Sequence, residues 1–384
     1  MNFNIHCSLR YQLCTIMEHE VIKYDVIIVG GGPAGCSSAY ELNKSGLRVL
    51  ILDKTNFPRH KPCAGGITMK TLKHLPIDIS HLVQHRAKKM IFNFGGNKQV
   101  NLNHNNGSCI MVIRDEFDKY FFEKTIESGV KFNKIFKINY INSLQNKIII
   151  SADDTEYECK YLIGADGANS VVRKLSSSIN YSNPVFAYEG LIEKNNTNYQ
   201  TEFIFNKSGY AWIFPKKDHY NVGIGTLIPL SGQKRVSKKE LTKFVSERFH
   251  GQAISNITAF PIGTEGDNYQ TSNNIFLVGD AAGLAESLLG EGIYNAVISG
   301  KYCALSIVSA CSNKRISAKE SYNKFLSQLT RELRLYRKGS KILYRFPKIS
   351  YWMMRFGLGK KFMDGYSEGK TLSEIMGKSN QFTI

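Results

Sequence analysis

Three glycines near the N-terminus have the spacing of a loop that binds a pyrophosphate group. Gly30, Gly32 and Gly35 form the pattern GxGxxG, with Pro33 and Ala34 inside it. The first glycine permits a tight turn off a strand, the second lets the backbone approach a phosphate, and the third lets the next helix pack on the sheet. Because the free amides of that helix then face the phosphates, these five residues predict a dinucleotide site.

The elements around this loop are those that such a site requires. Residues 24–29 form a β-branched apolar run, residues 33–45 have a helical pattern, and a second apolar run ends at Asp53. The Asp53 carboxylate is placed to bind a ribose hydroxyl, and we expect the adjacent Lys54 to contribute to the same site. Two continuous apolar strands predict a parallel sheet covered on both faces. A strand-to-helix turn without a ligand is the alternative interpretation.

Two later segments each place an aspartate directly after an apolar strand. Asp166 and Gly167 follow a strand that ends near residue 163, and Gly279 and Asp280 follow the short strand 275–278. A strand end can point a carboxylate at a cofactor hydroxyl, and the small neighbouring residues leave room for a ligand. Taken alone, either aspartate could instead form an Asp-Gly turn or cap a helix.

The order of these segments resembles a large flavoprotein family. The glycine loop, then Arg114 in an Arg-Asp-Glu-Phe-Asp run, then the two aspartate segments resemble the family that includes p-hydroxybenzoate hydroxylase, the halogenases and the geranylgeranyl reductases. The resemblance covers roughly residues 24–310 and implies FAD as the cofactor. It implies that Asp280 lies near the ribityl-pyrophosphate region, that Arg114 contacts the cofactor from its helix, and that Asp166 belongs to a motif shared between FAD and NAD(P)H handling.

A glycine-containing loop follows the last aspartate segment. It contains Gly290, Gly292 and Ile293. In the family this loop lies beside the isoalloxazine ring, where close backbone amides stabilise the negative charge that develops on reduction. A loop that merely interrupts a helix is the alternative.

The segment over residues 58–66 is similar to the Pro-Arg-x-Lys-x-Cys-Gly-Gly segment of geranylgeranyl reductases. Ala64 stands where glycine commonly follows the cysteine. The resemblance implies that Arg59, Cys63, Ala64 and Gly65 lie near the cofactor. We take Cys63 as the candidate catalytic residue, acting in proton delivery or gating. A small buried thiol chosen for packing is the alternative.

An aromatic run also fits the YxWxFP…GxG signature of that subfamily. Tyr210, Trp212 and Phe214 supply the aromatic part, and Gly223 and Gly225 complete it. These three rings are our candidates for the walls of an apolar substrate channel. An aromatic core strand is the bland interpretation.

The resemblance implies an FAD-dependent oxidoreductase that saturates C=C bonds of an isoprenoid or related lipid. No second GxGxxG is present, so either NAD(P)H visiting the FAD site or ferredoxin is the expected electron donor. The first alternative is an FAD-dependent monooxygenase acting on an apolar or aromatic substrate, although the WxWxIP motif of halogenases is missing. The second is a non-catalytic flavin-fold protein that binds a lipid or a partner through its basic tail.

The chain is strongly basic, with 50 Lys and Arg against 32 Asp and Glu and a net charge of +18. Such an excess favours an anionic partner, although a lysine-rich genome gives the same bulk charge. Residues 331–361 contain ten Lys or Arg, one Glu and many aromatic residues, a pattern typical of contact with an anionic bilayer surface. No nucleic-acid motif accompanies the charge, so nucleic acid is not an expected partner. A solvated helix face is the alternative.

The expected location is the cytoplasm, with peripheral contact at the inner face of the membrane. No apolar run reaches the length of a spanning helix. The eight cysteines form no CxxC pair, so no metal site is expected and free thiols are favoured.

The sequence predicts an α/β fold with interleaved parts. The expected parts are a discontinuous Rossmann-like FAD-binding domain (24–75, 105–180 and 270–325), a substrate-binding β-sheet domain (76–104 and 181–269), a helical basic C-terminal region (326–384), and an N-terminal extension (1–23) in which Met17 is an alternative start.

Overall fold

The computed structural model describes residues 21–145, 147–176, 185–206, 209–226, 236–264, 266–271 and 274–378. Most of the expected N-terminal extension, Met17 and the expected domain boundary between residues 180 and 181 lie outside the described residues. The six cysteines of the described part are free thiols.

The first sheet has the strand order β8-β2-β1-β11-β10-β9, and β17 pairs with β11. Its strands are β1 (Ile22–Val29), β2 (Val49–Asp53), β8 (Lys131–Lys134), β9 (Ile138–Ser143), β10 (Ile148–Ala152), β11 (Thr155–Gly164) and β17 (Ile275–Leu277). The pairs β1–β2, β1–β11 and β11–β17 are parallel. The predicted strand–helix–strand unit around the glycine loop is therefore confirmed.

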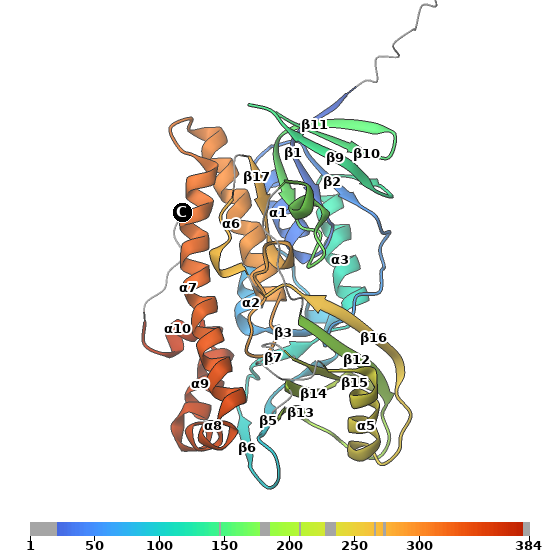
Figure 1. Cartoon of the computed structure of the whole chain (residues 1–384), viewed down its shortest axis with the longest axis vertical. Coiled ribbons are helices and arrows are strands. Elements are labelled where there is room, and N and C mark those ends of the chain that lie inside the picture. The colour runs from blue at the N-terminus through green and yellow to red at the C-terminus, as the bar shows by residue number, and fades with distance from the viewer. Residues whose placement is uncertain are drawn as a thin grey trace, which may run out of the picture.

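Three helices belong to this sheet: α1 (Pro33–Lys44), α3 (Arg114–Glu127) and α6 (Ile293–Ser312). Figure 1 shows α1 between the sheet and α6. Gly300 permits the close approach of α6, since a Cβ there would lie 2.3 Å from the Ala34 carbonyl oxygen. The apolar runs seen in the sequence form the core between these layers, with Ile27, Leu50 and Leu162 completely buried.

The second sheet has the order β16-β12-β15-β14-β13-β5-β6. Its strands are β5 (Lys89–Asn93), β6 (Gln99–Asn103), β12 (Val185–Glu193), β13 (Thr201–Asn206), β14 (Gly209–Pro215), β15 (His219–Gly225) and β16 (Ser255–Ile262). Side chains alternate along β14. Ala211 and Ile213 belong to the core beneath α5 (Lys238–Arg248), whereas Tyr210, Trp212 and Phe214 belong to a separate cluster on the other face.

A small third sheet links the two larger ones. It contains β3 (Gly66–Thr68), β7 (Cys109–Met111) and β4 (His85–Arg86), and α2 (Met69–His74) follows β3. Strand β4 comes from the segment expected in the substrate domain, whereas β3 and β7 come from segments expected in the FAD-binding domain. The two expected domains thus share this sheet.

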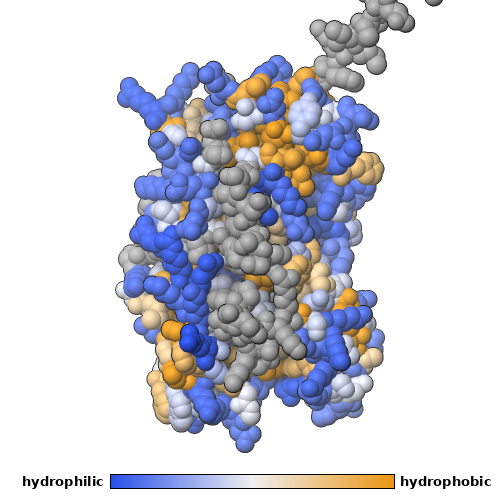
Figure 2. Space-filling model, in the orientation of Figure 1, coloured by the Kyte–Doolittle hydropathy of each residue, from blue (hydrophilic) through white to orange (hydrophobic). Residues whose placement is uncertain are grey.

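The C-terminal region is helical, as predicted. It consists of α7 (Ala318–Arg345), α8 (Pro347–Met353), the π-helical turn η4 (Met354–Leu358), α9 (Gly359–Ser367) and α10 (Leu372–Ile375). Helix α7 continues through the expected boundary at residue 326. Figure 1 shows α7 along one side of the molecule, with α8 and α9 at its lower end near β6. Figure 2 shows hydrophobic residues at the surface in that lower left part.

Candidate active site

A cavity of about 760 Å³ lies where the two large sheets and the C-terminal helices meet. Most of the residues predicted for the site line it. They are Gly30, Gly32, Pro33, Ala34, Asp53, Lys54, Arg59, Cys63, Ala64, Gly65, Arg114, Asp166, Gly167, Asp280, Gly290, Gly292, Ile293, Tyr210, Trp212 and Phe214. Segments that lie far apart in the sequence therefore meet around one space.

Two predicted residues, Gly35 and Gly279, are not among the lining residues. A Cβ on Gly35 would lie 1.9 Å from the Gly30 carbonyl oxygen, and one on Gly279 would lie 3.2 Å from the Ala34 Cβ. Both glycines therefore permit close packing beneath the site.

The glycine loop has the geometry of a phosphate cradle. Gly30 has a positive φ of 107° and donates its N–H to the Leu52 carbonyl, which closes the turn between the parallel strands. Gly32 precedes the first turn of α1, so the free amides of that helix border the cavity. The Gly31 N–H donates to the Asp53 carboxylate at 2.7 Å. This bond fixes the acid at the end of β2 beside the loop.

A cluster of arginines stands opposite the loop. Arg114 donates two 2.9 Å hydrogen bonds to Asp118, and Arg59 Nη2 lies 3.3 Å from the same carboxylate. A Cβ on Gly32 would lie 3.1 Å from Arg59 Nη2. Arg59 Nε is buried and has no hydrogen-bond partner among the described residues. Two guanidinium groups sharing one carboxylate, with one donor unpaired, fit an anionic group such as the diphosphate of FAD.

The two predicted aspartates behave differently. The Asp166 carboxylate accepts hydrogen bonds from Ser170 Oγ, Val171 N and Val172 N at 2.5, 2.6 and 3.2 Å. It caps α4 (Val171–Ser176), as the alternative interpretation from the sequence expects. The same residue also lines the cavity. Asp280 belongs to the short helix η3 (Gly279–Ala282).

The Asp280 carboxylate faces the loop at Gly290–Gly292, since a Cβ on Gly292 would lie 3.4 Å from its Oδ1. Burial raises the pKa of Asp280, and the nearby Lys61 ammonium opposes this shift. Lys61 lines the cavity, and burial lowers its pKa to about 7. Although Lys61 stands inside the Pro-Arg-x-Lys-x-Cys segment, sequence reasoning did not select it.

The loop that carries Cys63 is held from the second sheet. The Cys63 N–H donates to Glu189 Oε1 at 2.7 Å, and Lys216 Nζ donates to the Ala64 carbonyl at 2.7 Å. Burial raises the pKa of Glu189 and lowers that of Lys216 to about 8. Sequence reasoning missed both residues, although Lys216 directly follows the aromatic signature.

The alanine that departs from the family pattern is accommodated. The position that cannot carry a side chain is Gly65, which has φ +69° and whose Cβ would lie 2.1 Å from the Val112 carbonyl oxygen. Because Ala64 is not subject to this restriction, the turn retains the glycine that it requires.

The aromatic face of β14 forms one wall of the cavity. Tyr210 OH donates to the Leu289 carbonyl at 2.8 Å, and Trp212 Nε1 donates to Asn221 Oδ1 at 2.8 Å. Trp212 pairs with Gly223 on β15, where a Cβ would lie 2.1 Å from the indole ring. The glycines of the signature therefore make room for its rings.

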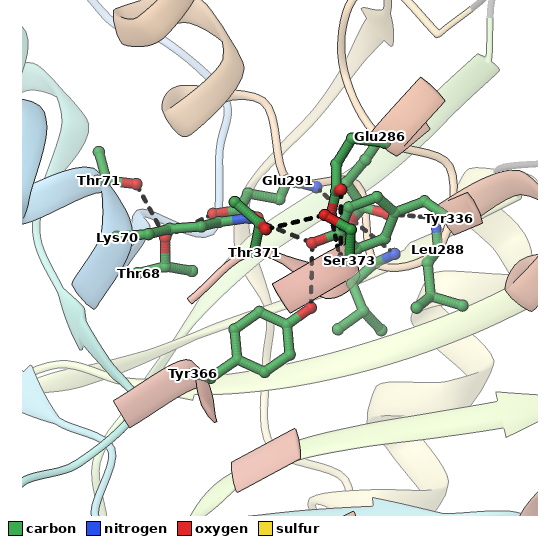
Figure 3. A network of polar contacts seen from close by, with 12 residues as sticks. Thr68, Lys70, Thr71, Glu286, Leu288, Glu291, Tyr336, Tyr366, Thr371 and Ser373 are labelled. Carbon is green, nitrogen blue, oxygen red and sulfur yellow. Dashed lines mark hydrogen bonds and ion pairs between the residues drawn. The ribbon is translucent and has the colours of Figure 1, made fainter. Parts of the chain in front are cut away.

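A buried polar network supports the loop at Gly290–Gly292 (Figure 3). Lys70 Nζ lies 2.7 Å from Glu291 Oε2 and donates to Tyr336 OH at 3.2 Å. Thr68 Oγ1 donates to Glu291 Oε1 at 2.6 Å, and the Tyr336 and Tyr366 hydroxyls are 3.3 Å apart. The network joins α2 and the loop to α7 and α9.

A second glutamate holds the backbone of the same loop. The Glu286 carboxylate accepts from the N–H groups of Leu288, Leu289 and Glu291 at 2.5 to 2.8 Å. Burial raises its pKa to about 7, against the lowering effect of these donors. Neither glutamate was selected from the sequence.

Comparisons with known proteins agree with this geometry. The family model described as FAD binding domain matches residues 23–307. A protein of Methanosarcina barkeri with no characterized function is 31% identical over 363 residues, which is 93% of each chain. Geranylgeranyl diphosphate reductase of Rhodobacter capsulatus is 29% identical over 299 residues, 74% of each chain.

The fold is also found in a solved structure. A geranylgeranyl bacteriochlorophyll reductase-like protein of Thermoplasma acidophilum has a TM-score of 0.73 at 21% identity, covering 93% of this chain and 96% of that one. The chain therefore belongs to the FAD-binding domain family of flavin-dependent oxidoreductases, and FAD is its cofactor.

Proposed function

We propose that this protein reduces C=C bonds in the chain of an isoprenoid or related lipid. The observation that carries the proposal is the composition of the cavity. Beyond the glycine loop and the arginine cluster, its lining becomes apolar. The apolar lining residues include Met90, Phe92, Phe94, Leu102, Phe203, Phe205, Trp212, Phe214, Leu343, Met354, Leu358 and Met363. An isolated alkene has no polar handle, so apolar walls must orient it.

The chain's own residues would orient the alkene, exclude water and hold a proton. When bound, reduced FAD supplies the hydride for one alkene carbon. The other carbon needs a proton, and Cys63 and Glu189 line the cavity next to each other. Cys63 also lies near enough to help raise the pKa of the Arg114 guanidinium. These contacts support Cys63 as an active-site residue and add Glu189 as a second proton donor.

We further propose that NAD(P)H or ferredoxin reduces the flavin and that the protein works in the cytoplasm at the inner face of a membrane. Residues 331–361 would make the membrane contact. Within the described residues, no helix combines the length and apolar character needed to cross a bilayer.

The proposal is tested with purified, FAD-loaded protein reduced by dithionite under anaerobic conditions. We expect geranylgeranyl diphosphate to gain two hydrogens per reduced double bond, measured by mass spectrometry. An oxygen-dependent gain of one oxygen atom, with no anaerobic reaction, would instead identify a monooxygenase. Cys63→Ala should slow the reduction while FAD stays bound, and Cys311→Ala, at an exposed cysteine, is the matched control. Unchanged turnover in Cys63→Ala would remove that thiol from the mechanism.

A further inference from the structure

An unusual number of apolar side chains is exposed where α7 meets α8 and η4. We call this set the apolar lip: Ile342, Phe346, Ile349, Trp352, Met353 and Phe356. Trp352 is 52% exposed and Phe356 is 74% exposed. Hydrophobic residues gather in this part of the surface in Figure 2. Contiguous exposed apolar residues rimmed by charge mark an interaction surface.

The same segment is also apolar on its inner side. Tyr344 is buried, and Leu343, Tyr351 and Met354 pack against the core of the second sheet. A surface helix of a globular protein normally keeps one polar face towards water. The exposed apolar residues of this segment therefore lie outside the face that packs on the protein and are available to an apolar partner.

The lip is continuous with the cavity. Ile342 and Met353 line the cavity and are also 46% and 45% exposed, so the lip shares two of its residues with the cavity lining. Gly357, with φ +119°, breaks the helical path directly after Phe356 of the lip. An apolar chain that slides past Ile342 and Met353 stays in contact with apolar side chains from the surface to the aromatic wall.

Cations surround the lip without acidic partners. Lys341, Arg345, Lys348 and Arg355 are exposed, and no described carboxylate lies within ion-pair distance of them. The sequence has no acidic residue between Glu332 and Asp364. An apolar centre with a basic rim fits an anionic bilayer surface. A second copy of the chain fits poorly, because a symmetric contact would bring two sets of these cations together.

We propose that the apolar lip inserts into an anionic membrane surface and that the cavity opens there, so that a lipid chain passes directly from the bilayer into the site. The binding of the lip stands on its own observations, whereas the passage of a substrate rests on the proposed function. The chain holds only two tryptophans, which makes both steps separately visible. Trp352 lies in the lip, and Trp212 lies on the cavity wall.

The first arm measures membrane contact with the FAD-loaded protein and vesicles of phosphatidylglycerol or phosphatidylcholine. We expect sedimentation with the anionic vesicles, a blue shift of tryptophan emission, and loss of that shift in Trp352→Phe. Ile349→Ser with Phe356→Ser should weaken binding at least tenfold. Ile316→Ser, at an exposed isoleucine before α7, should leave it unchanged. Absence of binding, or equal binding by the lip variant, overturns the proposal.

The second arm measures passage into the cavity without requiring turnover. In Trp352→Phe the remaining emission comes from Trp212, and vesicles that carry a brominated long-chain alcohol should quench it. The lip variant in this background should be quenched several-fold more slowly from vesicles but at the same rate from detergent micelles. Equal slowing in both, or no quenching from vesicles, overturns the opening at the lip. Quenching without alkene reduction would leave the lip intact and remove only the proposed function.

Discussion

Replacing Lys70 by methionine tests whether the buried network of Figure 3 stabilises the loop at Gly290–Gly292. The Lys70 and Glu291 side chains are 4% and 14% exposed, so solvent screens their 2.7 Å ion pair only weakly. Removing one partner of a buried pair costs about 3–5 kcal/mol, because the other charge is left uncompensated. Glu291 keeps the Thr68 hydroxyl as a donor, and methionine retains the apolar contacts of the lysine stem. We therefore expect a loss near the lower end, about 3 kcal/mol.

The assay is urea unfolding followed by circular dichroism, with FAD content measured in parallel. Lys73→Met is the matched control, since Lys73 lies on the same helix but is exposed, and its cost should stay within about 0.5 kcal/mol. Combining Lys70→Met with Glu291→Gln removes the unpaired charge, so the double variant should be more stable than the sum of the single losses predicts. A loss below about 1 kcal/mol for Lys70→Met, or strictly additive losses, would refute the reasoning.

The remaining predictions concern the signature glycine and two titratable groups. Gly223→Ala should lower the free energy of unfolding by about 1–3 kcal/mol, measured by thermal unfolding, because its Cβ overlaps the Trp212 ring. Gly339→Ala should be tolerated, because a Cβ there meets nothing closer than 4.0 Å. Equal effects of the two variants would contradict the packing explanation. Glu189→Gln keeps an oxygen that can accept the backbone N–H but carries no transferable proton, so alkene turnover should fall about 10²–10⁴-fold with FAD still bound; wild-type turnover would leave Glu189 a positioning role. Burial lowers the pKa of Lys61 to about 7, and a bound diphosphate raises it again. FAD binding above that pH therefore takes up a proton, and the affinity for FAD should fall between about pH 7 and 9. Calorimetry in two buffers measures both the affinity and the proton uptake. In Lys61→Met the affinity should depend less steeply on pH, and an unchanged dependence would argue against this linkage.

The parts of the site that could be predicted are those whose physical cause is local. Gly30 and Gly32 are required by the turn and the helix start that immediately follow, and Asp53 is required at the end of the next strand. The same locality leaves two interpretations open for Asp166, which lines the cavity and also caps a helix. Its carboxylate accepts a hydrogen bond from the first residue of a helix that begins five residues later. An apolar strand followed by Asp-Gly has the same sequence pattern whether the aspartate caps a helix or binds a cofactor.

The missed residues depend on partners that are distant in the sequence. Glu189 meets Cys63 across 126 positions, Lys216 meets Ala64 across 152, and Glu291 meets Thr68 across 223. A buried charge is stable only with a partner, but the sequence does not show which loop the fold will bring beside it. Helix α7 runs through residue 326, where a domain boundary is expected, for a related reason. The hydrophobic face of α7 continues from the α6 side of the molecule to the cavity, so the helix has no break at which a domain could end.

Helix α7 connects the proposed lip with the loop that leads to Gly290–Gly292. Ser340 Oγ donates to the Ser287 carbonyl at 2.6 Å, and Tyr344 OH donates to the Leu288 carbonyl at 2.9 Å. The next carbonyl, that of Leu289, accepts from Tyr210 on the aromatic wall. A buried loop needs such partners because it lacks the ladder of a sheet or helix. The backbone that leads into Gly290 is thus held by the same helix that carries Ile342 to the surface. If the proposed function and the proposed lip hold, one helix sets both the path of the lipid chain and the position of the Gly290–Gly292 loop, and the alkene that is reduced is selected by its distance along α7.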